Sequence, residues 1–433
     1  MLARPVLRAL ARRAAAPAAA LVAALAATAV AAPAAALPEL RVFARTYYVS
    51  PAGHDLWPGT TPLTPFRSLE RASQAPLRPG DRIVLQRGGT FAGGLTVAGD
   101  GTADEPVVVG AYGAGAAPVV TGGTCVRVTG SYVVVEDLEV RDCDWSGIEI
   151  EGAHVTVRGT TVSGNIAGIT VGAASTHARI LDNTLRDNDR MVPDTPGPYD
   201  DYGAYGVEVL GDHAEIAYNH ISGHVAPSAD FGADGSAVEL YGAVGTSVHH
   251  NTSVDNLTFT ELGHSDTTDS VFAYNTVRSS LPDATFLVTR GDGALFGPVR
   301  ATVAEHNSAS LTGPRSQAFW CGGSCGPDVL TLESNVLTST ARIGYAGVSA
   351  ESLGGGHNVL WGSVVEHPLS PGDLVADPRW VDPLADLALR AGSPAVDHGR
   401  GTTWTADVSG ARVPTDGDGD GVAAPDSGAH ERR

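Results

Sequence analysis

The chain has 433 residues, and its 28 Arg and Lys against 48 Asp and Glu give a formal net charge of −20 at pH 7. The sequence contains no lysine, so the cations other than histidine are all arginine and a catalytic lysine is excluded. So acidic a chain is not expected to bind nucleic acid through a phosphate-neutralising patch. Glycine is abundant (53 residues) and charged residues make up only 18% of the chain, which favours a turn-rich β protein.

The first 36 residues predict a secretory signal peptide. Arginines near the start precede the apolar run "AAAPAAALVAALAATAVAA", and small residues then lead to a cleavage site after Ala36. An uncleaved membrane anchor is the alternative. We therefore expect a secreted, extracellular protein that is monomeric and does not insert into a membrane once the leader is removed.

Four cysteines in an exported chain predict two disulfides, for which three pairings exist. Cys321 and Cys325 enclose only "GGS", which suggests a local loop closure. Cys125 and Cys143 are 18 positions apart, and the repeat described below makes them neighbours. A metal site formed by all four cysteines is the alternative, but the uneven spacing disfavours it.

A repeat of short strands occupies the centre of the chain. Segments such as "YGVEVLGDHAEIAYNHISGH" and "SAVELYGAVGTSVHHNTSVDN" each hold an alternating strand, a glycine turn, a second strand, an asparagine and a third strand. Such a repeat stacks into a β-solenoid. Asparagine tolerates a left-handed backbone, and its amide can bond to the next coil, so we expect an asparagine ladder. Its members are Asn183, Asn219, Asn251, Asn275, Asn307, Asn335 and Asn358.

A column of glutamates follows from the alignment of these repeats. Inward neighbours such as Val238 and Leu240 fill the core, so the glutamates point outward. Coils stack about 4.8 Å apart, and neighbouring carboxylates at that distance repel unless one is protonated or a cation lies between them. Glu208 and Glu239 are therefore candidate calcium ligands, with solvated outward glutamates as the alternative. The column comprises Glu149, Glu208, Glu239 and Glu261, interrupted once by Thr170.

Other reactive side chains gather around this column. Three long insertions, at 186–206, 224–235 and 290–299, border it and predict the walls of a binding cleft. Their aromatic side chains could stack on sugar rings, or could simply pack the loops. The candidate catalytic residues are Asp234, Glu239, Glu261, His264 and Arg290. The candidate substrate-binding residues are Tyr202, Tyr205, Phe231 and Tyr241.

The tail "DGDGDGVAAPD" places carboxylates at alternate positions before a glycine. Asp416, Asp418 and Asp420 precede Gly421 in a pattern similar to the start of a calcium-binding loop. The glutamate expected at the twelfth position is replaced by Ser427. A structural calcium site and a solvated acidic turn both remain open.

Together, these features resemble the right-handed parallel β-helix proteins of the pectate lyase-like superfamily. The opening "YYVSPAGHDLWPGTTPLTPFRSLERA" looks like their N-terminal cap, with a helix over 65–75, and "LVADPRWVDPLADLALRAGSPAVDHG" is similar to their C-terminal segment. The resemblance implies an all-β protein with a signal peptide (1–36), a cap with the first strands (37–105), β-helix coils (106–365) and a C-terminal capping segment with an acidic turn (366–433).

The resemblance leaves the reaction open, because this superfamily holds lyases, hydrolases, epimerases and adhesins. We expect a polysaccharide substrate, acidic or decorated, in a groove on the first sheet of the coils. A carboxyl pair would serve hydrolysis. The family's lyases use carboxylate-bound calcium with a lysine or arginine base, and without lysine the base would be Arg290, His264 or Tyr241. A uronan epimerase is a weaker expectation, and a non-catalytic glycan-binding or adhesin-like solenoid is the alternative.

Overall fold

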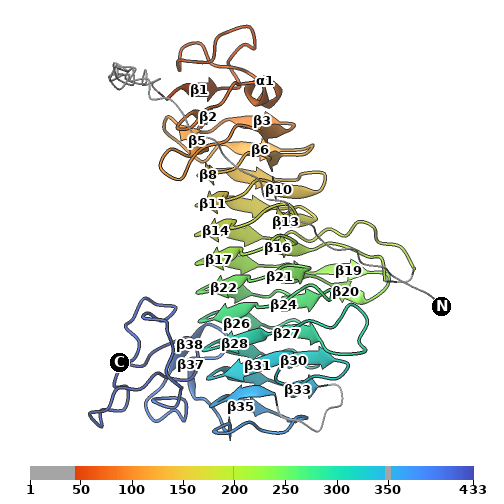
Figure 1. Cartoon of the computed structure of the whole chain (residues 1–433), viewed down its shortest axis with the longest axis vertical. Helices are drawn as coiled ribbons and strands as arrows, with labels where there is room; N and C mark the ends of the chain where they lie inside the picture. Colours follow the sequence, from red (N-terminus) through yellow and green to blue (C-terminus); the bar gives the residue numbers. More distant parts are fainter. Residues whose placement is uncertain (1–43, 198, 347–352) are drawn as a thin grey trace, which may run out of the picture. The chain divides into compact units, whose positions relative to one another are not determined.

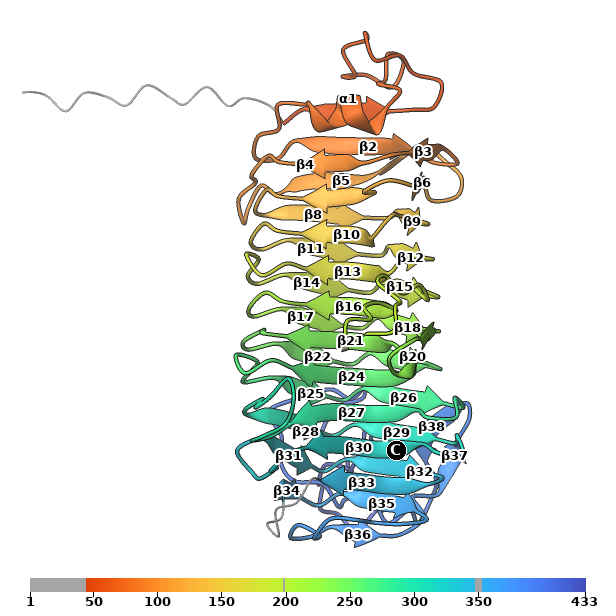
Figure 2. The same cartoon turned by 90° about the vertical axis from the view of Figure 1, so that its right-hand side faces the viewer.

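Three parallel sheets form the body of the molecule, and each coil from Arg82 to Ala346 contributes one strand to each sheet (Figures 1 and 2). The computed structural model describes residues 44–433 apart from 198 and 347–352, and these belong to one unit, Ala44–Arg433. The predicted signal peptide of residues 1–36 lies outside the described residues. We call the sheets A, B and C.

Sheet A has the first strand of the chain at one end. Its strands are β1 (Thr46–Val49), β2 (Arg82–Gln86), β5 (Val107–Tyr112), β8 (Val133–Glu136), β11 (Thr156–Arg158), β14 (Arg179–Leu181), β17 (Glu215–Ala217), β22 (Ser247–His249), β25 (Val271–Ala273), β28 (Thr302–Glu305), β31 (Leu330–Glu333) and β34 (Gly354–Gly356).

Sheet B follows sheet A along each coil. Its strands are β3 (Thr90–Ala92), β6 (Val119–Thr121), β9 (Glu139–Arg141), β12 (Thr161–Ser163), β15 (Thr184–Arg186), β18 (His220–Ser222), β23 (Thr252–Val254), β26 (Thr276–Ser279), β29 (Ser308–Leu311), β32 (Val336–Ser339), β35 (Val359–Gly362) and β36 (Leu374–Val375).

Sheet C carries the longest strands of the central coils. Its strands are β4 (Leu95–Val97), β7 (Val126–Val128), β10 (Ser146–Ile150), β13 (Ala167–Val171), β16 (Tyr205–Val209), β21 (Ser236–Tyr241), β24 (Thr258–Gly263), β27 (Thr285–Arg290), β30 (Gln317–Gly322) and β33 (Arg342–Ala346). Two hairpins lie outside the three sheets: β19 (Ala226–Ser228) with β20 (Gly232–Asp234), and β37 (Trp380–Asp382) with β38 (Asp386–Leu389).

The core follows from the alternation of side chains along each strand. In β21, Val238 and Leu240 are fully buried, whereas Glu239 between them reaches the outer surface. The next coil repeats this register, because Val238 pairs with Thr260 and Leu240 with Leu262. The inward residues of all three sheets therefore form one continuous apolar column.

The expected asparagine ladder is present, with one correction. Asn219 donates to Asn251 Oδ1 from its backbone (2.9 Å) and its amide (3.0 Å), and Asn251 repeats both bonds to Asn275. The left-handed backbone, however, belongs to the residue before each asparagine, for example His250 with φ 57°. That placement turns the asparagine side chain inward, where Asn251 is fully buried and can bridge coils.

A second ladder, which we did not predict, stabilises another turn. Asn165 donates to Asn188 Oδ1 from its backbone (3.1 Å) and its amide (2.8 Å). His224 takes the place of an asparagine in the next coil, where its Nδ1 accepts from the Asn188 backbone at 3.3 Å, and its own backbone donates to Asn256 Oδ1 at 2.9 Å. Burial lowers the pKa of His224 to about 4, so this imidazole accepts as a neutral ring.

The N-terminal helix is shorter than predicted. Helix α1 spans Leu69–Ser73 rather than 65–75, because Phe66 forms a β-bridge with Val49 and Ser68 caps the helix by accepting from the Arg71 backbone at 3.1 Å. Leu69 is buried against the first coils. Among the described residues, no helix is both long and apolar enough to span a bilayer.

Both predicted disulfides are present. Cys125 pairs with Cys143 across neighbouring coils with a Cα–Cα distance of 5.7 Å, and Cys321 pairs with Cys325 at 6.3 Å. The alternative of a metal site formed by the four cysteines is therefore wrong.

The C-terminal segment returns along the outside of the coils. Trp404 Nε1 donates to Glu305 Oε1 at 2.7 Å, and His306 Nδ1 lies 3.0 Å from the Asp426 carbonyl oxygen. Burial lowers the pKa of His306 to about 4, so its neutral ring can donate from Nδ1 to that carbonyl. The segment thus covers a flank of the later coils.

Candidate functional site

A cleft of about 820 Å³ lies over the outer face of sheet C. Its floor is formed by strands from β16 to β30, and the predicted insertions form its walls. The hairpin β19–β20 projects from the coils at this point (Figure 1). The lining residues are Trp145, Tyr199, Asp200, Asp201, Tyr202, Tyr205, Glu208, Leu210, Phe231, Ala233, Asp234, Glu239, Tyr241, Leu257, Thr258, Glu261, Gly263, Asp283, Arg290, Phe296 and Trp320.

The predicted glutamate column runs along the floor of this cleft. Glu208 pairs in register with Glu239, and Glu239 with Glu261, so the three side chains leave successive coils at the same position. Thr170 precedes Glu208 in the same register. Adjacent coils are about 4.8 Å apart, so each carboxyl requires its own means of neutralisation.

Glu208 accepts hydrogen bonds from hydroxyl groups. Its side chain is only 4% exposed, and its Oε2 accepts from Thr170 Oγ1 at 3.1 Å. Burial raises the pKa of Glu208, while hydrogen bonds from Tyr202 and Thr170 oppose that rise. The assignment of Glu208 as a calcium ligand stays a prediction.

Glu261 is neutralised by a buried cation. Arg290 Nη2 donates to Glu261 Oε1, and Arg290 Nη1 donates to the Leu262 carbonyl at 2.7 Å. The two side chains are 12% and 23% exposed. Burial works against the charge of Arg290, but Glu261 and Glu239 outweigh it and raise the pKa of the guanidinium. Arg290 is therefore a fixed cation and a poor candidate for the general base of an elimination.

Glu239 has the weakest support of the three. Its Oε2 accepts one hydrogen bond, from Ser236 Oγ at 2.8 Å. Burial, with repulsion from Glu261 and Asp234, raises the pKa of Glu239 well above its usual range. This carboxyl therefore retains a proton under conditions in which an ordinary glutamate is ionised.

Asp234 lies at the end of the β19–β20 hairpin and faces the same floor. Burial and the nearby Glu261 raise its pKa to about 7, although its Oδ1 accepts from the Gly235 backbone at 2.8 Å. The hairpin thus brings a second proton-holding carboxyl to Glu239 and Glu261.

His264 is the one predicted catalytic residue that does not line the cleft. Its ring is 5.3 Å from that of Tyr241, and its Nδ1 accepts from the Asp266 backbone at 3.2 Å. Tyr241 does line the cleft and also contacts Phe296. His264 thus lies behind the cleft wall, where it supports Tyr241.

All four predicted sugar-stacking residues line the cleft, and two tryptophans that we missed join them. Trp145 stacks on Tyr202 with ring centroids 4.8 Å apart. Trp320 lies in the glutamate column itself, since Glu261 pairs with Val288 and Val288 with Trp320. Extending the sequence alignment by two coils would have found Trp320, whereas Trp145 precedes its strand and carries no repeat signal.

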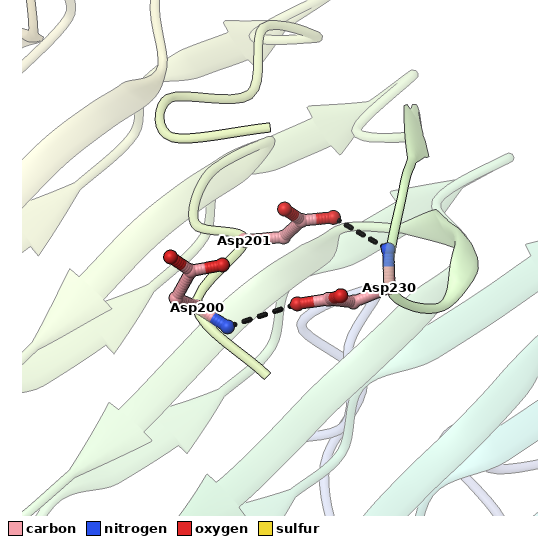
Figure 3. Close-up of side chains that lie close together, drawn as sticks. All are labelled: Asp200, Asp201 and Asp230. Carbon is pink, nitrogen blue, oxygen red and sulfur yellow. Dashed lines mark hydrogen bonds between the residues drawn. The ribbon is translucent and has the colours of Figure 1, made fainter. Parts of the chain in front are cut away.

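Two clusters of carboxylates have a geometry that suits a cation. Asp200, Asp201 and Asp230 join the long loop to the β19–β20 hairpin (Figure 3): the Asp200 backbone donates to Asp230 Oδ2 and the Asp230 backbone to Asp201 Oδ2, both at 2.9 Å. One oxygen from each lies within 4.8 Å of the others. Carboxylate oxygens are the donors that calcium prefers, and this cluster borders the cleft.

The second cluster corrects the predicted calcium loop. Asp397, Asp416 and Asp418 approach one another, whereas Asp420 is outside the group and accepts from the Val422 backbone at 2.7 Å. Asp397 belongs to this cluster because its carboxylate accepts a hydrogen bond from the Asp418 backbone at 2.9 Å. The sequence spacing alone could not reveal a partner 19 residues away.

The sequence matches no protein-family model and no curated protein. Among solved structures, pectate lyase Pel9A is similar with a TM-score of 0.58 and 16% identity, covering 90% of this chain and 96% of that one. The chain is a right-handed parallel β-helix of the pectate lyase-like fold.

Two further structures share this β-helix. The GH136 lacto-N-biosidase from Eubacterium ramulus has a TM-score of 0.54 at 16% identity, covering 77% of this chain and 67% of that one. XylC in complex with xylose has a TM-score of 0.51 at 10% identity, covering 89% and 99%. At these identities the likeness shows the fold, which confirms the predicted resemblance.

The chemistry available on the floor of this β-helix is proton transfer between unlike carboxyls. Glu261 forms an ion pair with Arg290, whereas burial and the neighbouring carboxyls raise the pKa of Glu239 on the adjacent coil. Pairs of titratable groups with such opposite surroundings are typical of general acid–base sites. Aromatic rings at both ends of the column provide apolar faces for a ring-shaped ligand.

Proposed function

We propose that the protein is a carbohydrate-active enzyme that hydrolyses a glycosidic bond in the sheet C cleft. The observation that supports this proposal is that Glu239 and Glu261 pair in register on adjacent coils but have opposite surroundings. Glu261 is ion-paired with Arg290, whereas burial and neighbouring carboxyls raise the pKa of Glu239. Glu239 would donate a proton to the leaving glycosidic oxygen, and Glu261 would act as the ionised partner. Asp234, with a pKa of about 7, is the alternative proton donor.

The separation of the two carboxyls bears on the stereochemical course. One coil step of about 4.8 Å is close to the roughly 5–5.5 Å between the carboxyls of retaining glycosidases. Asp234 and Glu261 come from different elements and could leave room for the water that inversion requires. The anomeric form of the first product, followed by proton NMR, distinguishes these pairs.

The charges of the cleft bear on the substrate. Seven of the lining residues are acids, and the single lining cation, Arg290, is already bound to Glu261. Such a lining repels a polyanion. We therefore favour an uncharged glycan over the acidic polysaccharide expected from the sequence, with Trp145, Tyr202 and Trp320 as stacking surfaces.

The test is an assay of a glycan panel with the native protein and two variants, Glu239→Gln and Glu261→Gln. We expect new reducing ends without absorbance near 235 nm, and a loss of at least 10²-fold in both variants, the lower range for positioned acid–base groups. Glu149→Gln is a matched control, because Glu149 lies in the same column three coils before Glu239 and outside the cleft lining. Full turnover by Glu239→Gln and Glu261→Gln would refute the assignment.

Elimination from a uronate is the second candidate, favoured by the Asp200, Asp201 and Asp230 cluster beside the cleft. Calcium bound there would neutralise a uronate carboxylate, and Tyr241 would remain as the candidate base. Absorbance at 235 nm that disappears with chelator would select this reaction. Binding without any product would instead select the glycan-binding or adhesin-like alternative.

We also propose that the protein acts outside the cell as a monomer. Both disulfides support export, because such bonds persist in oxidising compartments. Fractionation of the producing cell with detection of the protein in the medium, followed by light scattering of the purified chain, tests both statements.

A further inference from the structure

A second hollow, of about 710 Å³, lies on the outer face of sheet B beside the C-terminal hairpin β37–β38. Its floor comes from strands β29, β32 and β35, and the hairpin forms one wall. Strand β38 contacts β29 and lies beside the later coils (Figure 2). We call this hollow the sheet B groove.

Hydroxyl groups and an exposed tryptophan form the floor of the sheet B groove. Ser310 pairs in register with Thr338, and Thr338 with Trp361, so these side chains point outward from three successive coils. Trp361 is 48% exposed and lies within the groove. A large aromatic face flanked by hydroxyl groups is an arrangement that suits the apolar face of a sugar ring.

The wall of the groove is fixed in place by packing and hydrogen bonds. Trp380 of β37 is 7% exposed and packs with Val336 and Val359 from the outer face of sheet B. The hairpin turn is held by Arg278 Nη1, which donates to the Leu384 and Ala385 carbonyls at 2.9 and 2.8 Å. The groove is therefore a preformed surface and does not need to assemble around a ligand.

Hydrogen-bond donors in the groove lack partners. The indole N–H of Trp380 is buried without an acceptor in the described part of the chain. Arg390 Nη2 donates to the Val381 carbonyl. The Arg379 side chain is exposed, and within residues 44–197, 199–346 and 353–433 its guanidinium has no hydrogen bond or ion pair, so it is open to a ligand. A buried unpaired donor is destabilising unless a ligand accepts from it, and an arginine offers five donors to an acceptor-rich ligand.

We propose that the sheet B groove is a second saccharide-binding site that holds a glycan without cleaving it. The ring would lie on Trp361, and Arg379 would bind a carboxylate, so a uronate-bearing saccharide is favoured over a neutral one. Asp377 is the single carboxylate of the groove, and its Oδ1 already accepts from the Arg379 backbone at 2.8 Å. A single carboxyl supplies no acid–base pair, which separates this groove from the sheet C cleft.

Calorimetric titration with two probes of equal length, a neutral and a uronate β-1,4-linked pentasaccharide, tests the proposal. We expect native protein to bind the uronate probe, Trp361→Ala to weaken binding at least tenfold, and Arg379→Ala to abolish the preference for the uronate. Trp57→Ala is the matched control, since Trp57 is 39% exposed but lies on the N-terminal segment outside the groove.

The proposal fails if neither probe binds, or if the isotherms of native protein and Trp361→Ala coincide. Thermal unfolding of each variant separates loss of binding from loss of fold. This inference does not depend on the hydrolytic proposal: Trp361→Ala should hydrolyse a short soluble substrate as the native protein does, whereas Glu239→Gln should retain the Trp361-dependent binding. These experiments therefore distinguish failure of the binding proposal from failure of the hydrolytic proposal.

Discussion

Replacing Asn251 with Ala should remove one link of the asparagine ladder and destabilise the protein by about 2–6 kcal/mol. Asn251 is fully buried, and its Oδ1 accepts from both the backbone and the amide of Asn219. Its Nδ2 donates to the Ile216 carbonyl (2.8 Å) and to Asn275 Oδ1 (3.0 Å). Alanine leaves at least the Asn219 backbone donor and the Ile216 acceptor without their side-chain partner, each at about 1–3 kcal/mol.

Urea unfolding followed by circular dichroism measures this change. Asp189→Ala, an exposed substitution near the cleft loop, is the control and should shift stability by less than about 0.5 kcal/mol. A decrease of less than about 1 kcal/mol in the free energy of unfolding for Asn251→Ala, with an unchanged slope against urea, would refute the view that the ladder stabilises the fold. The amide would then only mark a turn.

Three further predictions concern other parts of the molecule. The Asp234→Asn variant should be as stable as the native protein at pH 4 and more stable by roughly 1–3 kcal/mol at pH 8. The reason is that the folded-state pKa of Asp234 is raised to about 7, so the native protein loses stability as pH rises through that value. Equal pH dependence of the two proteins in urea unfolding would contradict this. Arg290→Lys should lower kcat/KM at least tenfold, since an ammonium cannot reproduce the two-pronged contact; unchanged kinetics with an active substrate would contradict it. Replacing both Cys125 and Cys143 with Ser should cost about 3 kcal/mol, the value for a loop of this length; an unchanged denaturation midpoint would contradict it.

The first asparagine ladder and the glutamate column were predictable from the sequence because they repeat, whereas features that arise once were not; the second ladder repeats but is interrupted by His224, and the alignment missed it. The ladder asparagines and the glutamate column recur at one position per coil, so the alignment placed Glu208, Glu239 and Glu261 on neighbouring strands. His224 was not predicted because it takes the place of an asparagine, so its residue type differs from those at the same position in the adjacent coils. Asp397 was not predicted because it lies far from the acidic turn in the sequence and approaches it only in the folded chain.

The charge state of the cleft could not be predicted from the sequence for a related reason. The alignment shows that carboxyls stack, but their partners come from other elements: Thr170 from an earlier coil, Tyr202 from a loop, and Arg290 from a later coil. Only the assembled structure shows that Glu208 receives hydroxyl donors and Glu261 a guanidinium. Among the described residues, Glu239 has no guanidinium partner and a single hydroxyl donor, Ser236.

This difference predicts opposite effects of the same substitution at neighbouring positions. Glu239→Gln removes a carboxyl whose ionisation is opposed by burial, Glu261 and Asp234, so at pH 8 the variant should be more stable than the native protein. Glu261→Gln leaves Arg290 buried without its counter-ion, which costs roughly 3–5 kcal/mol. Urea unfolding of both variants at pH 8 measures the two changes, and effects of the same sign would contradict the assignment. Since both substitutions should abolish turnover, a stabilised but inactive Glu239→Gln would show that the protein retains this carboxyl at the expense of stability, as expected for a residue kept for chemistry.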